Sequence, residues 1–162
     1  MLVTHDQTEA MTFAREVIVM KQGEVVQAGT PRTLFDRPAT DYVGWFIGSP
    51  AMNFLQAHLH RGRVSVTGTG FSVAAPAGLK GDGLSLGFRP EHARIVDNGA
   101  QVSGTVERIW FEGSDEVVSL TSDGLTMRVR TGTDRPFGPG DVLGISVPSE
   151  NLLIYSKGRL VA

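Results

Sequence analysis

Short runs in which apolar and polar residues alternate dominate the chain from residue 50 to its end. Alternation of this kind is typical of β-strands that have one face in a core and the other in water. The clearest runs cover residues 55–60, 64–67, 84–88 and 125–130. Turns rich in glycine and aspartate separate the runs, at residues 81–83, 97–99, 122–124 and 137–141. Many short strands joined by such turns predict a mainly β fold, either a sandwich or a small barrel.

The first 49 residues mix helix and strand signals instead. Asp6 can cap a helix, and Val17-Ile18-Val19-Met20 is an uninterrupted apolar run of the kind found in buried strands. Two further helices are predicted, one with Thr30 as its cap and one with Thr40. This part of the chain therefore has an α/β pattern.

The change of pattern at Gly48-Ser49-Pro50 divides the chain into a segment over residues 1–49 and a β domain over residues 50–162. In 162 residues, 15 basic and 17 acidic side chains give a net charge of −2. Nucleic-acid and anionic-membrane surfaces need clustered excess lysine and arginine, so both are disfavoured. Cysteine is absent, which excludes disulfides, thiolate catalysis and cysteine-ligated zinc. No apolar run approaches the roughly 20 residues of a membrane span, and no signal-peptide pattern opens the chain.

A single histidine near the N-terminus is the first candidate for chemistry. His5 follows the apolar stub Met1-Leu2-Val3, which we expect to form a strand, and precedes the helix that Asp6 caps. The carboxyl end of a strand in an open α/β sheet is where ligands bind, and an imidazole there can bond a phosphate oxygen or an attacking water. The alternative is a capping or surface histidine without a chemical role.

The residues around His5 are the first of several blocks that resemble one family. The blocks cover residues 3–11, 17–20, 23–31, 46–50, 52–55 and 87–92. The first block, Val3-Thr4-His5-Asp6-Gln7-Thr8-Glu9-Ala10-Met11, resembles the switch-histidine region of ABC-transporter ATPase subunits. The last two, Met52-Asn53-Phe54-Leu55 and Gly87-Phe88-Arg89-Pro90-Glu91-His92, are similar to the subunits of maltose- and glycerol-phosphate-type sugar importers. Such subunits carry a C-terminal regulatory domain of oligonucleotide-binding-fold (OB) barrels, of the TOBE type.

The resemblance implies a fold and a role for each part of the chain. Residues 1–49 would be the C-terminal remnant of the ABC nucleotide-binding domain, and residues 50–162 the TOBE/OB-type regulatory domain, with one or two small β-barrels. His5 matches the switch histidine that senses the γ-phosphate of ATP. The chain would be the regulatory and dimerisation part of a subunit that couples ATP hydrolysis to the import of sugars or related solutes.

The rest of the family's catalytic set is missing from the sequence. It contains no Gly-x-x-x-x-Gly-Lys-Ser/Thr loop, no signature like Leu-Ser-Gly-Gly-Gln, and no strand-end Asp-Glu pair ahead of His5. Phosphoryl transfer depends on positioning and electrostatics from all of these parts together. We therefore expect that this chain alone holds no cofactor or metal and does not hydrolyse ATP. ATP and Mg²⁺ would belong to the complete parent subunit.

The resemblance also implies partners and a location. The partners would be a second copy in a homodimer, the membrane permease subunits, and a sugar-uptake regulatory protein, with no nucleic acid. The location would be the cytoplasm, peripheral to the inner face of the cell membrane. Residues 1–49 contain apolar runs without enough partner strands, so three outcomes stay open for them: order against the β domain, disorder, or pairing with a second copy through open strand edges.

Two motifs of the β domain are weaker candidates with plain structural alternatives. Arg89-Pro90-Glu91-His92 is either a ligand-contact loop or inter-domain hinge, or a structural turn closed by an Arg–Glu pair, since proline fixes the backbone there. Gln56, His58 and His60 share one strand face, where they would either ligate a metal or face solvent.

Aromatic and basic residues further along the chain give two more candidates. Trp110-Phe111, ahead of an acidic loop, would supply one aromatic to the core and one to a partner, or one to the core and one to the sheet edge. Arg128 and Arg130 lie on the polar face of their strand, where they would bind an anion or be solvated.

The alternative function is a barrel that senses a small ligand, either an oxyanion or a sugar phosphate. Its cleft would need backbone amides and hydroxyls, for which Thr131-Gly132-Thr133 and Ser146 are candidates. An oligonucleotide-binding protein is a third hypothesis that rests on fold analogy. It would need a basic groove with stacking aromatics, which the net charge of −2 and 7% aromatic residues disfavour.

Overall fold

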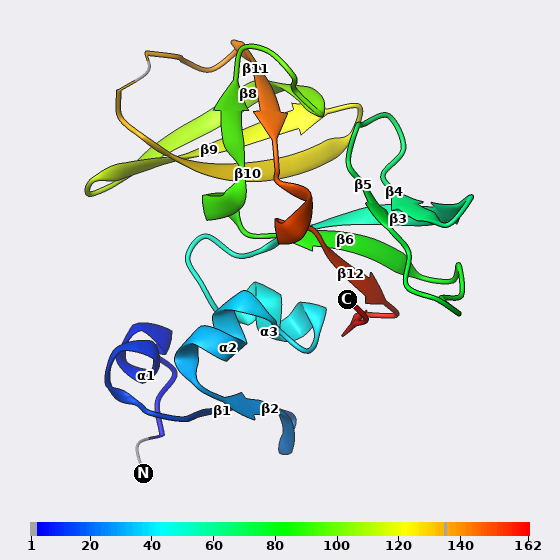
Figure 1. The fold of residues 1–162 in the computed structure, drawn as a ribbon. Coiled ribbons are helices and arrows are strands. Elements are labelled where there is room, and N and C mark those ends of the chain that lie inside the picture. The colour runs from blue at the N-terminus through cyan, green and yellow to red at the C-terminus, as the bar shows by residue number, and fades with distance from the viewer. Residues whose placement is uncertain (1–2, 135) are drawn as a thin grey trace.

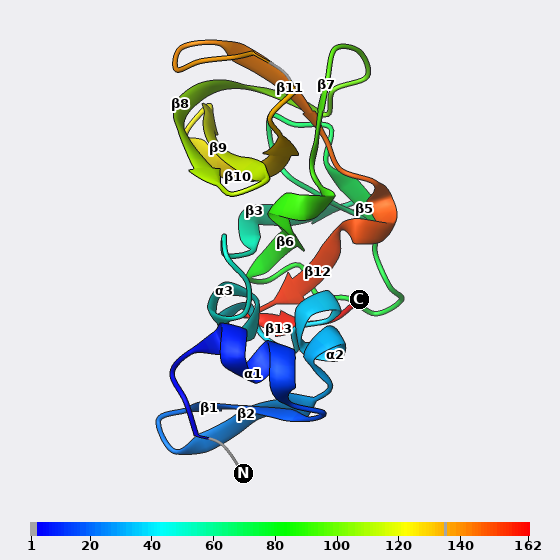
Figure 2. The ribbon, with the colours of Figure 1, turned by 90° about the vertical axis from the view of Figure 1, so that its left-hand side faces the viewer.

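The computed structural model describes residues 3–134 and 136–162. Met1 and Leu2, part of the stub expected to form a strand, lie outside the described residues. Figure 1 shows the helices and hairpin of the N-terminal segment at one end of an elongated molecule, with the β-sheets beyond them. Figure 2, from a perpendicular direction, shows the same order. The molecule is therefore a stack, with the α/β segment at one end and two sheets above it.

The N-terminal segment consists of short helices and one hairpin. In chain order its elements are α1 (Gln7–Phe13), β1 (Val17–Lys21), β2 (Glu24–Gly29), α2 (Pro31–Asp36) and α3 (Asp41–Phe46). The side chains of Asp6, Thr30 and Thr40 cap the helices, as the sequence predicts. A small core of its own includes Val17, Leu34 and Val43. Of the outcomes left open for this segment, the structure has residues 3–49 ordered against the β domain.

The β domain consists of two antiparallel sheets that share one core. The six-stranded sheet has the order β13-β12-β6-β3-β4-β5. Its strands are β3 (Asn53–His60), β4 (Arg63–Ser65), β5 (Ser72–Ala74), β6 (Leu84–Phe88), β12 (Leu153–Ser156) and β13 (Arg159–Leu160). The five-stranded sheet has the order β10-β9-β8-β11-β7. Its strands are β7 (Arg94–Val96), β8 (Val102–Glu112), β9 (Asp115–Ser122), β10 (Leu125–Gly132) and β11 (Val142–Ser146). Two single-turn helices, η1 (Pro90–His92) and η2 (Ser149–Asn151), join strands of the two sheets.

Three of the four alternating runs form strands of this domain, as predicted, whereas the run over residues 64–67 lies only in part in β4. Residues 55–60 lie in β3, 84–88 form β6, and 125–130 lie in β10. Leu86 and Phe88 on β6 are fully buried, as are Met127 and Val129 on β10. The two sheets therefore contribute their apolar faces to the same core, which fits a mainly β architecture of small barrels.

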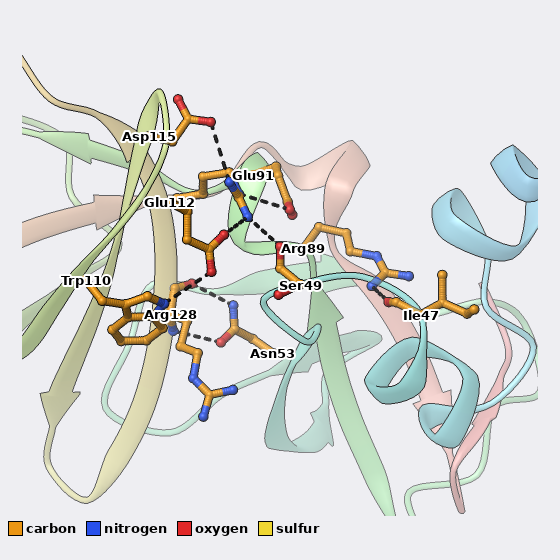
Figure 3. A network of polar contacts seen from close by, with 10 residues as sticks. Ile47, Ser49, Asn53, Arg89, Glu91, Trp110, Glu112, Asp115 and Arg128 are labelled. Atoms are coloured by element: carbon orange, nitrogen blue, oxygen red, sulfur yellow. Dashed lines mark hydrogen bonds and ion pairs between the residues drawn. The ribbon is translucent and has the colours of Figure 1, made fainter. Parts of the chain in front are cut away.

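A buried asparagine links the two sheets at the start of β3. The Asn53 side chain donates from Nδ2 to the Arg128 carbonyl oxygen at 2.9 Å, and its Oδ1 accepts from the Arg128 amide at 2.8 Å. Asn53 is 7% exposed, so water does not compete well for these bonds. The side-chain amide of Asn53 thus makes the same pair of bonds to the backbone of β10 that a neighbouring strand would make, although Asn53 belongs to the other sheet. Figure 3 shows this reciprocal contact.

The expectation of a strand directly ahead of His5 is wrong for the described part of the stub. Val3 is in no strand and is 83% exposed. Its backbone pairs with no strand among the described residues, and without such hydrogen bonding a residue cannot form part of a sheet. Within the described ranges, no helix is both long enough and apolar enough to cross a membrane.

Replacing Asn53 with alanine should lower the free energy of unfolding by about 2–3 kcal/mol, because a buried amide and a buried carbonyl lose their partners. Gln56→Ala, on an exposed position of the same strand, is the matched control and should change it by less than about 0.5 kcal/mol. Urea denaturation followed by tryptophan fluorescence measures both. Equal losses in the two variants would contradict a special role for Asn53.

Candidate functional site

The N-terminal segment meets the β domain along a seam formed with the last strands of the chain. Tyr155 on β12 is fully buried, and its hydroxyl donates to the Pro38 carbonyl oxygen at 2.9 Å. The Leu160 amide donates to the Ala39 carbonyl oxygen at 3.0 Å, so main chain pairs with main chain nearby. Burial raises the pKa of Tyr155 and outweighs the opposing field of Arg89, so the phenol stays a neutral donor. The segment is thus bonded to the β domain and not only in contact with it.

Arg89 is the centre of this seam. It directly follows β6, is 2% exposed, and sends its guanidinium into the N-terminal segment. Nε and Nη2 donate to the Phe35 carbonyl oxygen at 3.0 and 2.9 Å. Nη1 donates to the carbonyl oxygen of Gly44 at 3.1 Å and also to that of Ile47 (Figure 3). The guanidinium of Arg89 also lies over the Phe35 ring, with its Cζ atom 4.2 Å from the ring centroid.

The chemistry of these acceptors explains why a charge is tolerated here. Phe35 and Gly44 lie in the last turns of α2 and α3, and Ile47 is the C-cap of α3. Carbonyl groups at such helix ends lack helical partners and carry partial negative charge. Burial lowers the pKa of Arg89, and the fields of Glu91 and Tyr155 partly offset the effect. Arginine nevertheless stays protonated. Arg89 therefore acts as a shared C-terminal cap for two helices that belong to another part of the chain.

Two glycines make room for this arrangement. A Cβ on Gly48, whose φ is +104°, would lie 2.8 Å from Nη1 of Arg89. A Cβ on Gly44 would lie 2.8 Å from Cζ of Phe54 and 2.9 Å from Sδ of Met52. Real Cβ atoms do not approach other atoms this closely, so a side chain at position 44 would require Phe54 and Met52 to shift.

A second arginine, Arg130, bonds the chain just after Gly48, where the N-terminal segment continues into the β domain. Arg130 on β10 donates to Glu112 at 2.5 Å and lies 3.4 Å from Glu91 and 3.5 Å from Asp115. It also donates to the Ser49 carbonyl oxygen. Burial opposes its charge, but the bond to Glu112 and the fields of Glu112 and Glu91 outweigh burial and raise the pKa of Arg130.

These contacts correct the structural-turn interpretation of Arg89-Pro90-Glu91-His92. Glu91 pairs with Arg130 and not with Arg89, because the Arg89 side chain turns toward α2 and α3. The motif therefore contributes bonds between the two parts of the chain, and an inter-domain hinge at this motif stays a prediction. Arg89 and Arg130 bond the main chain on either side of Gly48, at Ile47 and Ser49, and Figure 3 shows Arg89 beside Ile47.

The remaining histidines lie elsewhere. His5 is exposed in the turn ahead of α1, and its side chain has no hydrogen bond or ion pair within residues 3–134 and 136–162. Gln56, His58 and His60 lie on the exposed face of β3, and Nδ1 of His58 is 3.3 Å from the Thr67 hydroxyl. The part of the chain that the structure describes contains no group of three His, Cys, Asp or Glu side chains able to hold a metal.

The aromatic and basic candidates separate into different roles. Trp110 is half-buried and donates to Glu112 at 3.2 Å, whereas Phe111 is 67% exposed near the tip of the β8–β9 hairpin. The Arg128 side chain is exposed, as the solvated alternative has it, but Arg130 belongs to the ion cluster.

The residues suggested for an oxyanion lie in unfavourable surroundings. Thr131 and Gly132 pair across the sheet with Glu116 and Asp115, whose carboxylates oppose an anion, and Thr133 follows in the chain. Ser146 is instead directed toward the Gln101 side chain, at 3.4 Å.

Sequence reasoning missed Asn53, which links the two sheets, and Tyr155, which bonds the N-terminal segment to the β domain. A signal for Asn53 exists: it occupies the inward register of β3, in line with the buried Leu55, where a polar residue needs a partner. Tyr155 is part of the apolar run from Leu152, and nothing local identifies Pro38 as its acceptor.

Replacing Arg89 with methionine should lower the free energy of unfolding by about 3 kcal/mol, because buried carbonyls at two helix ends lose their donors. Arg128→Met removes an exposed guanidinium and should change it by less than about 0.5 kcal/mol. Limited proteolysis adds a local readout, since cleavage within residues 30–48 should accelerate in the Arg89 variant alone. Unchanged stability and cleavage would contradict the role of Arg89 in the joint.

Gly48→Ala should destabilise the protein more than Gly62→Ala. Both glycines have positive φ, but a Cβ on Gly62 meets nothing within 4 Å, so that variant reports backbone strain alone, about 1–2 kcal/mol. The clash with Arg89 should add about 1–3 kcal/mol at position 48. Thermal unfolding of the pair measures the difference, and equal midpoints would contradict the close approach.

Comparison with known proteins supplies the family. Residues 48–93 match the MalK OB fold domain, and residues 86–154 match the TOBE domain. The chain is 38% identical over 160 residues to the sn-glycerol-3-phosphate import ATP-binding protein UgpC of Vibrio vulnificus (strain CMCP6), covering 96% of this chain and 43% of the relative. The UgpC protein of Chromohalobacter salexigens is 49% identical over 106 residues, which are 65% of this chain and 28% of that relative.

Among solved structures, the molybdate-bound form of the cytoplasmic molybdate-binding protein ModG aligns with a TM-score of 0.47 and 12% identity. The alignment covers 65% of this chain and 94% of that chain. The chain spans less than half the length of the UgpC relatives that it matches, and the match covers their C-terminal part. With its OB-fold and TOBE domains, the chain belongs to the family of ATP-binding subunits of sugar-type ABC importers, as their C-terminal portion.

Proposed function

We propose that this chain is the regulatory and dimerisation part of an importer's ATP-binding subunit and that it does not hydrolyse ATP by itself. The observation that carries the proposal is the Arg89 joint, in which a residue of the β domain caps two helices of the N-terminal segment. A joint of this kind fixes the orientation of the β domain relative to those helices. A movement of α2 and α3 would then displace the β domain as well, because the two are bonded to each other.

The parent subunit would work with membrane permease subunits, on the inner face of the cell membrane, in the import of a sugar or related solute. The family and the names of the relatives support this role. His5 would contact the γ-phosphate of ATP there, and its exposed position leaves its ring free to do so. ATP and Mg²⁺ would be held by residues of the parent subunit, and a sugar-uptake regulatory protein would act on the β domain.

The purified chain should show no ATP turnover above buffer, because the phosphate loop, the signature and the strand-end carboxylates are absent from its sequence. His5→Ala should therefore leave the phosphate release rate unchanged. A coupled phosphate assay at millimolar ATP measures both proteins. Turnover that His5→Ala abolishes would overturn this part of the proposal.

Light scattering after size exclusion should give twice the chain mass of 17.4 kDa, through contacts of residues 50–162. Phe111 is exposed near a hairpin tip of this domain, so Phe111→Asp should shift the mass toward the monomer. Ile18→Asp, on the exposed face of β1, is the discriminating control and should leave the dimer intact. A monomeric wild-type chain, or a dimer that only Ile18→Asp dissociates, would contradict dimerisation through the β domain.

A further inference from the structure

An open cavity of about 370 Å³ lies against the seam, and Arg89 is one of the residues that line it. Its walls come from four stretches of chain: α2 with the residue that follows it, Met52 ahead of β3, η1 with Arg89 ahead of it, and the region of η2. Arg37, His92 and Asn151 line it from three of these stretches. A volume near 300 Å³ is the lower limit for small-molecule pockets, so the cavity suits a small ligand.

Charge and hydrogen-bonding capacity in the cavity favour an anion. Arg32, Arg37 and Arg89 line it together with two carboxylates, so three positive charges against two negative ones leave an excess of one. Arg89 is bonded to carbonyl oxygens, and Arg32 is paired with Asp36 at 3.1 Å.

The Arg37 guanidinium differs from the other two. Within residues 3–134 and 136–162 it has no side-chain hydrogen bond and no carboxylate within ion-pair distance, and the same holds for the side chains of His92 and Asn151. Three donors from distant parts of the chain, Arg37 exposed and His92 and Asn151 half-buried, therefore line one cavity without a partner among the described residues.

We propose that this cavity binds a phosphate group, either as inorganic phosphate or as a small phosphate monoester. The planar fork of Arg37 matches two phosphate oxygens, and the tetrahedral group has further oxygens for the Asn151 amide and an imidazole N–H of His92. Glu150 also lines the cavity, and its carboxylate weakens binding without occupying the donors. The cavity exceeds the size of the phosphate group, which leaves room for a short organic substituent.

A phosphate bound here would bridge the N-terminal segment and the β domain. Arg37 follows α2, whereas His92 and Asn151 belong to turns of the β domain. A bound phosphate would add bonds across the seam beside those of Arg89. A ligand that binds only when the two parts are in contact stabilises that contact by mass action. The proposal does not rest on dimerisation or on the absence of ATP turnover, which separate measurements test.

Isothermal titration of the full chain with sodium phosphate, at ionic strength held constant with sodium chloride, tests the site. We expect saturable binding of one phosphate per chain and a higher unfolding temperature in phosphate than in chloride. Arg37→Ala should weaken binding about tenfold or more, as expected for the loss of a charged hydrogen-bonding partner. Arg128→Ala, which removes an exposed guanidinium outside the cavity, should bind as wild type.

Glu150→Gln supplies a test with the opposite sign, because removal of a repelling carboxylate should tighten binding several-fold. A structural perturbation would not produce that gain, and circular dichroism confirms that each variant is folded. Titration with methyl phosphate distinguishes the two sources: tighter binding than inorganic phosphate identifies an ester as the ligand, and weaker binding identifies free phosphate. Absence of saturable binding, or equal affinity in wild type, Arg37→Ala and Glu150→Gln, would overturn the proposal.

Discussion

The buried guanidinium of Arg89 is the interaction on which the relation between the two parts of the chain depends. A charge that is 2% exposed loses its hydration, and the loss is offset only if its N–H donors find acceptors of suitable polarity. The carbonyl groups of Phe35, Gly44 and Ile47 accept four hydrogen bonds from Arg89, and the field of Glu91 also favours its charge. Each side therefore depends on the other: the helix ends need donors, and the arginine needs acceptors.

This mutual dependence makes the joint specific as well as stable. An apolar contact between α3 and β3 would tolerate sliding, but a planar fork bonded to carbonyl oxygens in two helices fixes both distance and rotation. Arg130 adds a second fixed point through the Ser49 carbonyl oxygen, and Glu91 connects it to the turn that follows Arg89. The main chain on either side of Gly48 is thus bonded by two arginines of the β domain.

The local features of the fold were predictable from the sequence, and the long-range ones were not. Alternation identified the strands around Leu86 and Met127, and the threonine caps located α2 and α3, because both signals act within a few residues. The acceptors of Arg89 lie 54, 45 and 42 residues away, and no pattern near position 89 encodes them. Arg128 and Arg130 are equivalent in the alternating pattern, yet the fold exposes one and pairs the other with three carboxylates.

The hairpin of the N-terminal segment shows which side of it is incomplete. Val17 and Val19 face the segment's own core, while Ile18, Met20 and Val25 are more than half exposed on the hairpin. Strands that are apolar on both faces are typical of sheets covered on both sides, and a cluster of exposed apolar side chains marks a surface that another structure contacts. The UgpC relatives are more than twice as long as the region they share with this chain, so they have further chain available to cover such a surface. The segment therefore has hydrogen bonds to the β domain on one side and exposed apolar side chains on its hairpin. A structure that covers the hairpin would act on the β domain through α2, α3 and the guanidinium of Arg89.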